Sequence, residues 1–158
     1  MKQFQTVYRG ENAFRTTVSE WQLHCAHKPV LIRLFSDGAD PSEISSACAI
    51  IDELMRISGL IHEAIRKLNI NASDGRWGGE EFMLMLPGMT REAAAVFAEE
   101  IRQEIEKLRF EKCGKVSASF GVAQAMPEED ADPLVVRADT ALYKAKASGK
   151  NPVCQAQE

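Results

Sequence analysis

The sequence has no apolar run near the roughly eighteen residues that would span a bilayer, and residues 1–4 lack the apolar stretch of a signal peptide. It also has no dense block of lysine and arginine, and its formal net charge is −4 at pH 7. An extended nucleic-acid-binding surface is therefore not expected, although a few local cations could hold a small anionic ligand. We expect a soluble, cytoplasmic protein that makes no membrane contact of its own.

Cysteine is scarce, and the four cysteines form no Cys-x-x-Cys pair: Cys25, Cys48, Cys113 and Cys154. This spacing argues against a zinc site and against a secreted disulfide framework, so we expect reduced thiols. Internal repeats are absent as well. A chain of 158 residues of which 45% are hydrophobic is large and apolar enough for a proper core. We therefore expect residues 1–158 to form a single domain.

Apolar periodicity predicts the elements. Helical spacing, with capping residues at several starts, predicts helices over 11–25, from Asp40 to near Leu68, from Thr90 to Leu108, and from Asp132 to Gly149. Runs typical of strands are Val30–Phe35, Phe82–Leu86, Val116–Ala123 and a short segment over 151–154, and we expect Val116–Ala123 to be central in the sheet. This order predicts an α/β (α+β) fold with a central, mostly antiparallel β-sheet surrounded by helices.

One segment needs a chemical explanation: Arg-Trp-Gly-Gly-Glu-Glu-Phe over residues 76–82, followed by an apolar run. Two glycines between apolar runs permit a tight turn, and they predict a β-hairpin with Glu80 and Glu81 at its mouth. Adjacent carboxylates repel each other unless solvent, a cation or a basic partner lies beside them. The hairpin is therefore either an ordinary solvated acidic turn or one side of a site for a hard divalent cation.

Three other side chains are candidates for the same site. Ser36-Asp37-Gly38 has turn chemistry after a strand, and Asp37 is a further candidate metal ligand if this turn lies near the glutamates. Lys146 and Lys150 lie four residues apart at the end of the last predicted helix. A favourable interaction with the helix dipole would explain these lysines, and binding of phosphate is the alternative if the fold brings them toward the hairpin.

The sequence strongly resembles the GGDEF family of diguanylate cyclase domains. The resemblance rests on the GGEEF form of the signature at 78–82, the strand 116–123, the Ala-Asp-Thr-Ala-Leu-Tyr-Lys-Ala-Lys run at 138–146, and Ser-Gly-Lys-Asn at 148–151. It covers roughly the second half of the chain, in order and in spacing. The implied fold is that of nucleotidyl cyclases and the polymerase palm, and the implied reaction joins two GTP molecules, held by two copies of the domain, into cyclic di-GMP.

Residue roles follow from the resemblance alone. Glu80 is implied as a metal ligand, and Glu81 as a second metal ligand or an aid to deprotonation of the attacking 3′-hydroxyl. Gly78 and Gly79 would let the nucleotide approach the backbone, and Asp52 aligns with the acid that hydrogen-bonds guanine. Lys146 and Lys150 match positions that contact phosphates. The implied cofactor is Mg²⁺ or Mn²⁺, and the implied partners are GTP, cyclic di-GMP and a second copy of the chain.

Several departures concern the first half of the chain. Phe35 stands where the family has a metal-binding aspartate, Asp40 where it has a phosphate-facing lysine, and Glu43 where it has a guanine-binding asparagine. Loss of one metal carboxylate and exchange of a cation for an anion should weaken binding of Mg-GTP. Asn69 and Ala72 occupy the two positions of the family's Arg-x-x-Asp product-inhibition site, so feedback by that route is not expected.

Three hypotheses remain open. The first is a degenerate domain that binds GTP or cyclic di-GMP and has weak or no cyclase activity, and it is the one we favour. The second is an active homodimeric diguanylate cyclase. The third is a non-catalytic scaffold for dimerisation or partner contacts, which would have no physical need for two glutamates and two lysines at one site.

Overall fold

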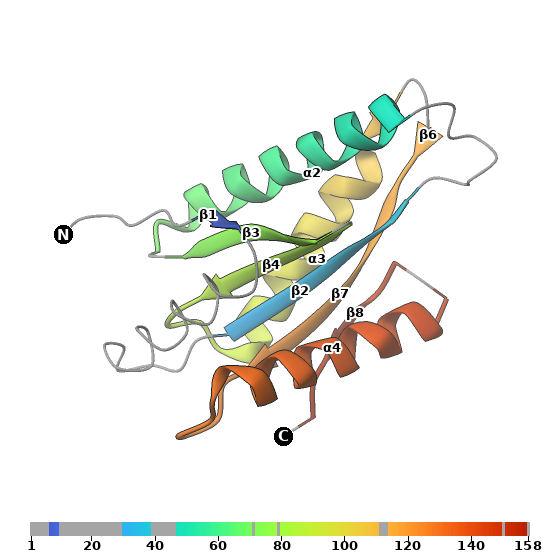
Figure 1. Ribbon diagram of the computed structural model, residues 1–158. Coiled ribbons are helices and arrows are strands. Elements are labelled where there is room, and N and C mark those ends of the chain that lie inside the picture. The colour runs from blue at the N-terminus through green and yellow to red at the C-terminus, as the bar shows by residue number, and fades with distance from the viewer. Residues whose placement is uncertain are drawn as a thin grey trace.

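The computed structural model describes residues 7–9, 30–38, 47–70, 72–78, 80–110, 114–149 and 151–157. The helix predicted over 11–25, the helix-start residues Asp40 and Glu43, and two candidate site residues, Gly79 and Lys150, lie outside this part of the chain. Within it, the chain forms a six-stranded sheet, a two-stranded sheet and three helices (Figure 1).

The large sheet has the strand order β1-β3-β4-β2-β7-β8. Its strands are β1 Val7–Arg9, β2 Val30–Gly38, β3 Ser73–Gly78, β4 Glu81–Leu86, β7 Ser117–Gln124 and β8 Val153–Gln155. The pairs β2–β4, β2–β7 and β3–β4 are antiparallel, whereas β1–β3 and β7–β8 are parallel. The predicted mixed fold with a mostly antiparallel central sheet is confirmed.

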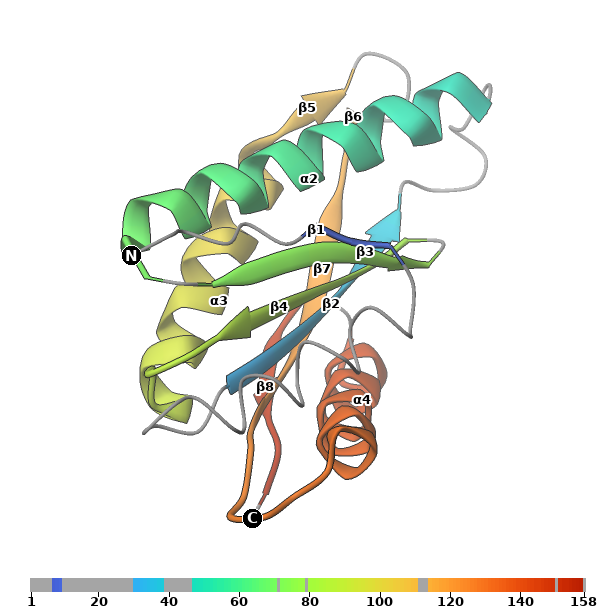
Figure 2. The same cartoon turned by 60° about the vertical axis from the view of Figure 1, so that its left-hand side comes forward.

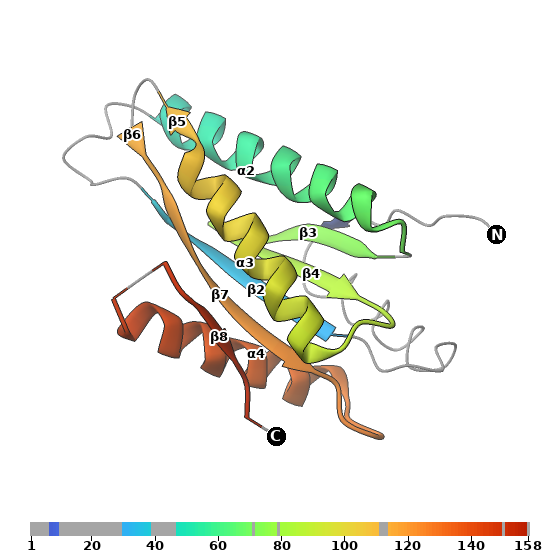
Figure 3. The ribbon, with the colours of Figure 1, turned by 180° about the vertical axis from the view of Figure 1, so that it is seen from behind.

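Helices cover both faces of this sheet (Figure 2). The first face carries α2 Ala47–Leu68 and α3 Arg91–Lys107, and α3 lies in front of the sheet, alongside β7, when the molecule is seen from behind (Figure 3). The second face carries α4 Ala131–Ala147. Side chains of β2 and β4 alternate between two apolar clusters, so that Ile32 and Leu84 pack toward α2 and α3, and Leu31 and Met83 toward α4. Because both faces are covered, the central strands are apolar almost throughout.

The helix predictions in the described part of the chain hold with small shifts. Thr90 caps α3 as predicted and accepts a hydrogen bond from the backbone N–H of Ala93 at 3.2 Å. α2 ends at Leu68 as predicted and continues without interruption through Gly59. α4 begins at Ala131, after Asp130, and not at the predicted cap Asp132, which lies in the first turn instead. No helix of the described part is long and apolar enough to cross a membrane.

The prediction that the first long strand ends at Phe35 in a turn over 36–38 is wrong. β2 continues to Gly38, because β7 still provides partners: Ser36 pairs with Ala118 and Gly38 with Ser117. An irregularity in register between Ser36 and Gly38 absorbs the extra residue. Asp37 therefore lies within a β-strand and not in a loop after it. The predicted last strand is present as β8, whereas β1 and the small β5–β6 ladder, Arg109–Phe110 with Gly114–Lys115, were not predicted.

Candidate functional site

The Gly-Gly-Glu-Glu segment connects two paired strands, as the sequence predicted. β3 ends at Gly78 and β4 begins at Glu81, and these two residues are register partners after a shift between Arg76 and Gly78. Glu80 is half-buried in the turn between them. On its other side Glu81 pairs with Phe35 of β2. Glu81 is thus flanked by a glycine on one strand and by a phenylalanine on the other, and no carboxylate is its direct partner across either pair.

A buried arginine lies at the centre of the site. Arg33 belongs to β2, is only 7% exposed, and donates from Nη2 to Oε2 of Glu81 at 2.7 Å. Its other terminal nitrogen, Nη1, forms an ion pair with Oδ1 of Asp139 in α4. The guanidinium carbon also lies 5.7 Å from the ring centroid of Trp77, the residue before Gly78. One cation therefore joins the hairpin, the central strand and α4.

This arrangement depends on how closely α4 approaches the sheet. Arg33 is flanked in the sheet by Met83 of β4 and by Gly121 of β7. A Cβ atom on Gly121 would lie 2.2 Å from the carbonyl oxygen of Ala138 and 2.5 Å from the backbone nitrogen of Leu142. Only a residue without a side chain permits this contact. The glycine thus brings the helix close to the sheet at the residue next to Asp139.

Burial is the main influence on the carboxyl group of Asp139. It raises the pKa of this group above its ordinary value, while the Arg33 guanidinium opposes the shift and the negative charge of Glu81 adds to it. Lys146, about two turns further along α4, also favours the ionised form of Asp139. Lys146 therefore lies near enough to the cluster for its charge to act on Asp139. Binding of phosphate by Lys146 stays a prediction.

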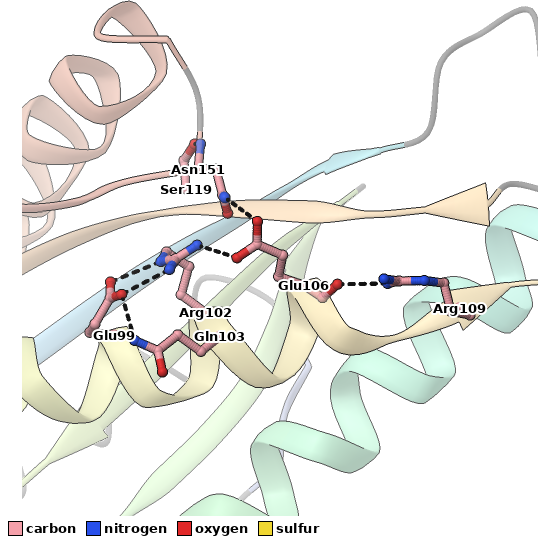
Figure 4. Close-up of polar contacts among 7 residues, drawn as sticks. All are labelled: Glu99, Arg102, Gln103, Glu106, Arg109, Ser119 and Asn151. Carbon is pink, nitrogen blue, oxygen red and sulfur yellow. Dashed lines mark hydrogen bonds and ion pairs between the residues drawn. The ribbon is translucent and has the colours of Figure 1, made fainter.

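The turn that follows α4 is held by hydrogen bonds to two other elements (Figure 4). Asn151 adopts a left-handed conformation, with φ at 66°, and its backbone N–H donates to Oγ of Ser119 in β7 at 3.0 Å. Its side-chain amide donates to Glu106 of α3 at 3.3 Å, and Glu106 also accepts from Arg102 at 2.9 Å. The residue directly after Lys150 is therefore anchored to the body of the molecule.

The remaining predicted site residues are placed by their backbone. Asp37 lies in β2, Asp52 in the first part of α2, and Gly78 at the end of β3, but the description of the structure does not extend to the side chains of Asp37 and Asp52. The structure thus brings Glu80, Glu81 and Lys146 into one region. Whether Asp37, Asp52 and Lys150 join them stays a prediction.

A divalent cation does not fit the donor set that the structure describes. Within that set, no three histidine, cysteine, aspartate or glutamate side chains gather as metal ligands. Glu81, a predicted ligand, already has an oxygen engaged with Arg33. Sequence reasoning missed Arg33, although one signal was present: it is the single charged residue in the apolar run Val30–Phe35. A charge in such a run requires a buried partner.

Comparison with known proteins gives a consistent result. The family model described as "Diguanylate cyclase, GGDEF domain" matches residues 52–152. The chain is 36% identical over 104 residues to diguanylate cyclase VdcA of Vibrio cholerae, covering 60% of this chain and 31% of VdcA. It is 42% identical over 81 residues to diguanylate cyclase DgcM of Escherichia coli, covering 51% of this chain and 20% of DgcM. The chain thus spans a third or less of the length of these relatives.

The fold agrees with solved structures of the same kind. The active GGEEF domain of a diguanylate cyclase from Vibrio cholerae superposes with a TM-score of 0.79 at 26% identity, covering 93% of this chain and 94% of that one. The GGDEF domain of DgcB from Caulobacter crescentus, solved in complex with cyclic di-GMP, has the same fold, with a TM-score of 0.83 at 23% identity over 100% of this chain and 99% of that one. The match to the family model extends over well more than half of the chain, and the chain belongs to the GGDEF family of diguanylate cyclase domains.

Proposed function

We propose that this domain acts in cyclic di-GMP signalling by binding a guanine nucleotide, GTP or cyclic di-GMP, at the Gly-Gly-Glu-Glu hairpin, with cyclase activity weak or lost. One observation carries the loss of activity. Glu81 pairs across the sheet with Phe35, so no carboxylate faces it there, and one of its two oxygens is already bound by Arg33 at 2.7 Å. The proposed place of action is the cytoplasm, and neither nucleic acid nor membrane is a partner.

The proposed nucleotide contacts involve five residues. Gly78 and Gly79 let the phosphates or the base approach the backbone of the hairpin, since neither carries a side chain. Lys146 and Lys150 act as point charges toward phosphate. Asp52 accepts hydrogen bonds from the N–H donors of guanine, which a carboxylate suits. The anchoring of Asn151 to Ser119 and Glu106 supports the part that involves Lys150, because it fixes the backbone beside this lysine.

The alternative is an active cyclase that works as a homodimer. It is favoured by the likeness to the active GGEEF domain of Vibrio cholerae, whose signature this chain shares. Diguanylate cyclases are in general metal-dependent, so this alternative requires Mg²⁺ or Mn²⁺ held by Glu80 and Glu81, with Asp37 in place of the missing aspartate. It also requires Glu81 to leave Arg33.

The experiment is a direct assay with GTP. The purified protein is incubated with GTP and Mg²⁺, and separately with Mn²⁺, and cyclic di-GMP is quantified by liquid chromatography and mass spectrometry. We expect traces at most. Clear turnover that is abolished by Glu81→Gln would refute the loss of activity and establish the cyclase. Calorimetric titration with GTP and with cyclic di-GMP tests binding, and the absence of binding to both would leave only the scaffold.

A further inference from the structure

The charges of Glu81 and Asp139 are balanced by cations of the protein itself. Arg33 contributes one positive charge and contacts two carboxylates, Glu81 and Asp139, from two different elements. Lys146 contributes a second positive charge that acts on Asp139. These four side chains together are neutral, so Arg33 and Lys146 relieve the repulsion between Glu81 and Asp139 without an external cation.

Arg33 is also held in place by more than its ion pairs. Only 7% of its surface is exposed, and its backbone lies in the central strand β2, between β4 and β7. The Trp77 ring lies 5.7 Å from its guanidinium carbon and adds a cation–π contact from the hairpin itself. A metal ion competing for Glu81 would have to leave this buried guanidinium with fewer partners, and a buried charge without its partners is strongly unfavourable.

We propose that Arg33 is the resident counter-ion of Glu81 and takes the place of a divalent cation, so that the site binds no divalent metal by itself and binds its nucleotide without one. The part that concerns the nucleotide rests on the proposed function. The part that concerns the metal rests only on Arg33, Glu81 and Asp139. Glu81 serves here to hold Arg33, and the positive charge offered to the nucleotide is provided by fixed side chains.

The first test measures metal binding in the absence of nucleotide. Mn²⁺ is titrated into the wild-type protein, and free Mn²⁺ is measured by electron paramagnetic resonance. We expect no stoichiometric binding up to millimolar Mn²⁺. The variant Arg33→Met removes the charge and replaces the arginine by another long, unbranched side chain. Glu81 and Asp139 then lose their shared cation, and we expect the affinity for Mn²⁺ to rise by about tenfold or more.

The matched control is Arg137→Met on α4, the helix that carries Asp139. Arg137 is a half-buried arginine that also binds a carboxylate, Glu129, at 2.5 Å. It also donates to the carbonyl of Gln124, which pairs with Val30 at the end of β2 opposite to Phe35. This variant removes an ion pair far along the strand from Glu81, so it should acquire no Mn²⁺ site. Circular dichroism checks that both variants fold. If Arg33→Met does not fold, the Mn²⁺ titration of the wild-type protein decides the proposal.

The second test measures nucleotide affinity by calorimetry, with GTP in EDTA and with GTP in excess Mg²⁺. We expect dissociation constants that agree within about threefold, because fixed charges of the protein replace the ion. Stoichiometric Mn²⁺ binding by the wild type, or binding of GTP that EDTA abolishes, would overturn the proposal while leaving the proposed function standing. Absence of GTP and cyclic di-GMP binding under all conditions would instead overturn the proposed function, and the Mn²⁺ titration would still decide the role of Arg33.

Discussion

Replacement of Gly121 by alanine should separate α4 from the sheet and destabilise the domain. The added Cβ would lie 2.2 Å from Ala138 O, 2.5 Å from Leu142 N and 2.9 Å from Leu142 Cβ. Two of these atoms belong to the backbone of α4 and cannot swing away, so relief requires the helix to move by about 1 Å to restore ordinary contact distances. Overpacking of a close-packed interior typically costs about 1–3 kcal/mol, and we expect the upper part of this range or more.

The shift should also reach the candidate site. Asp139 follows Ala138 directly, so movement of α4 carries its carboxylate away from Arg33, whose strand neighbour is Gly121 itself. Equilibrium unfolding in urea measures the loss of stability as a lower midpoint, provided that the denaturant slope is unchanged. Calorimetric titration with GTP or cyclic di-GMP then reports whether the displaced helix weakens binding.

A second glycine is the control. Gly59 lies exposed in the interior of α2, and no heavy atom lies within 4 Å of the position where its Cβ would stand. Gly59→Ala should therefore stabilise the domain by about 0.5–1 kcal/mol, through helix propensity alone. Opposite signs for the two glycine-to-alanine changes are the expected result. A Gly121→Ala variant as stable as the wild type would refute the close approach of α4 and the placement of Asp139 that depends on it.

Three further predictions concern other parts of the fold. Burial raises the pKa of Asp74 despite the opposing effect of His62, so ionised Asp74 lowers the stability of the folded protein above the folded-state pKa, and this loss disappears as the pH falls toward the ordinary value of about 4. Asp74→Asn should stabilise the domain by roughly 0.5–1 kcal/mol at pH 7 and should lose this advantage near pH 4. A stability advantage that grows in acid would contradict this prediction. Burial alone would raise the pKa of Glu129, but hydrogen bonds from Arg137 and from the backbone N–H of Met126 lower it overall. Arg137→Met should therefore destabilise the domain by about 1–3 kcal/mol at neutral pH. In urea unfolding, the difference in free energy of unfolding between this variant and the wild type should narrow as the pH falls through the pKa of Glu129. Asn151→Ala places an alanine at a φ of 66° and should lower the free energy of unfolding by about 1 kcal/mol more than Asn151→Gly does. Both variants lose the contact with Glu106, so calorimetry should show that they weaken GTP binding equally.

Local sequence signals predicted the elements whose determinants are close together in the chain. Two glycines between apolar runs predicted the hairpin, and Thr90 with the following apolar stripe predicted α3, because capping and periodicity act within a few residues. β1 and the β5–β6 ladder were missed, because strands of two or three residues carry almost no periodicity. β1 in particular depends on pairing in parallel with β3, which no local pattern encodes.

The centre of the candidate site could be predicted only in part. The signature located Glu80 and Glu81 at the mouth of the hairpin, since the turn that positions them is itself local. The partners of Arg33 could not be predicted, because both are distant in the sequence. Glu81 lies 48 residues away, and Asp139 lies on α4, which follows β7 in the chain. A charged residue inside an apolar strand indicates that some buried partner exists. Only the packing of α4 over Gly121 determines which one it is.

The two unusual residues of β2 together account for the charge of one divalent ion. The resemblance places Phe35 at the position of a metal-binding aspartate, and an aspartate there would pair directly with Glu81 across the sheet. Two facing carboxylates require a strong positive charge between them. With aspartate at 35 and a neutral residue at 33, the site would be two units more negative than it is. Phe35 removes one of these charges and Arg33 compensates the other, so a change at one of the two positions alone would leave the site unbalanced by one unit. The absence of the aspartate and the presence of a buried arginine two residues before it therefore act in the same direction, because both lower the negative charge that a divalent cation would have to neutralise.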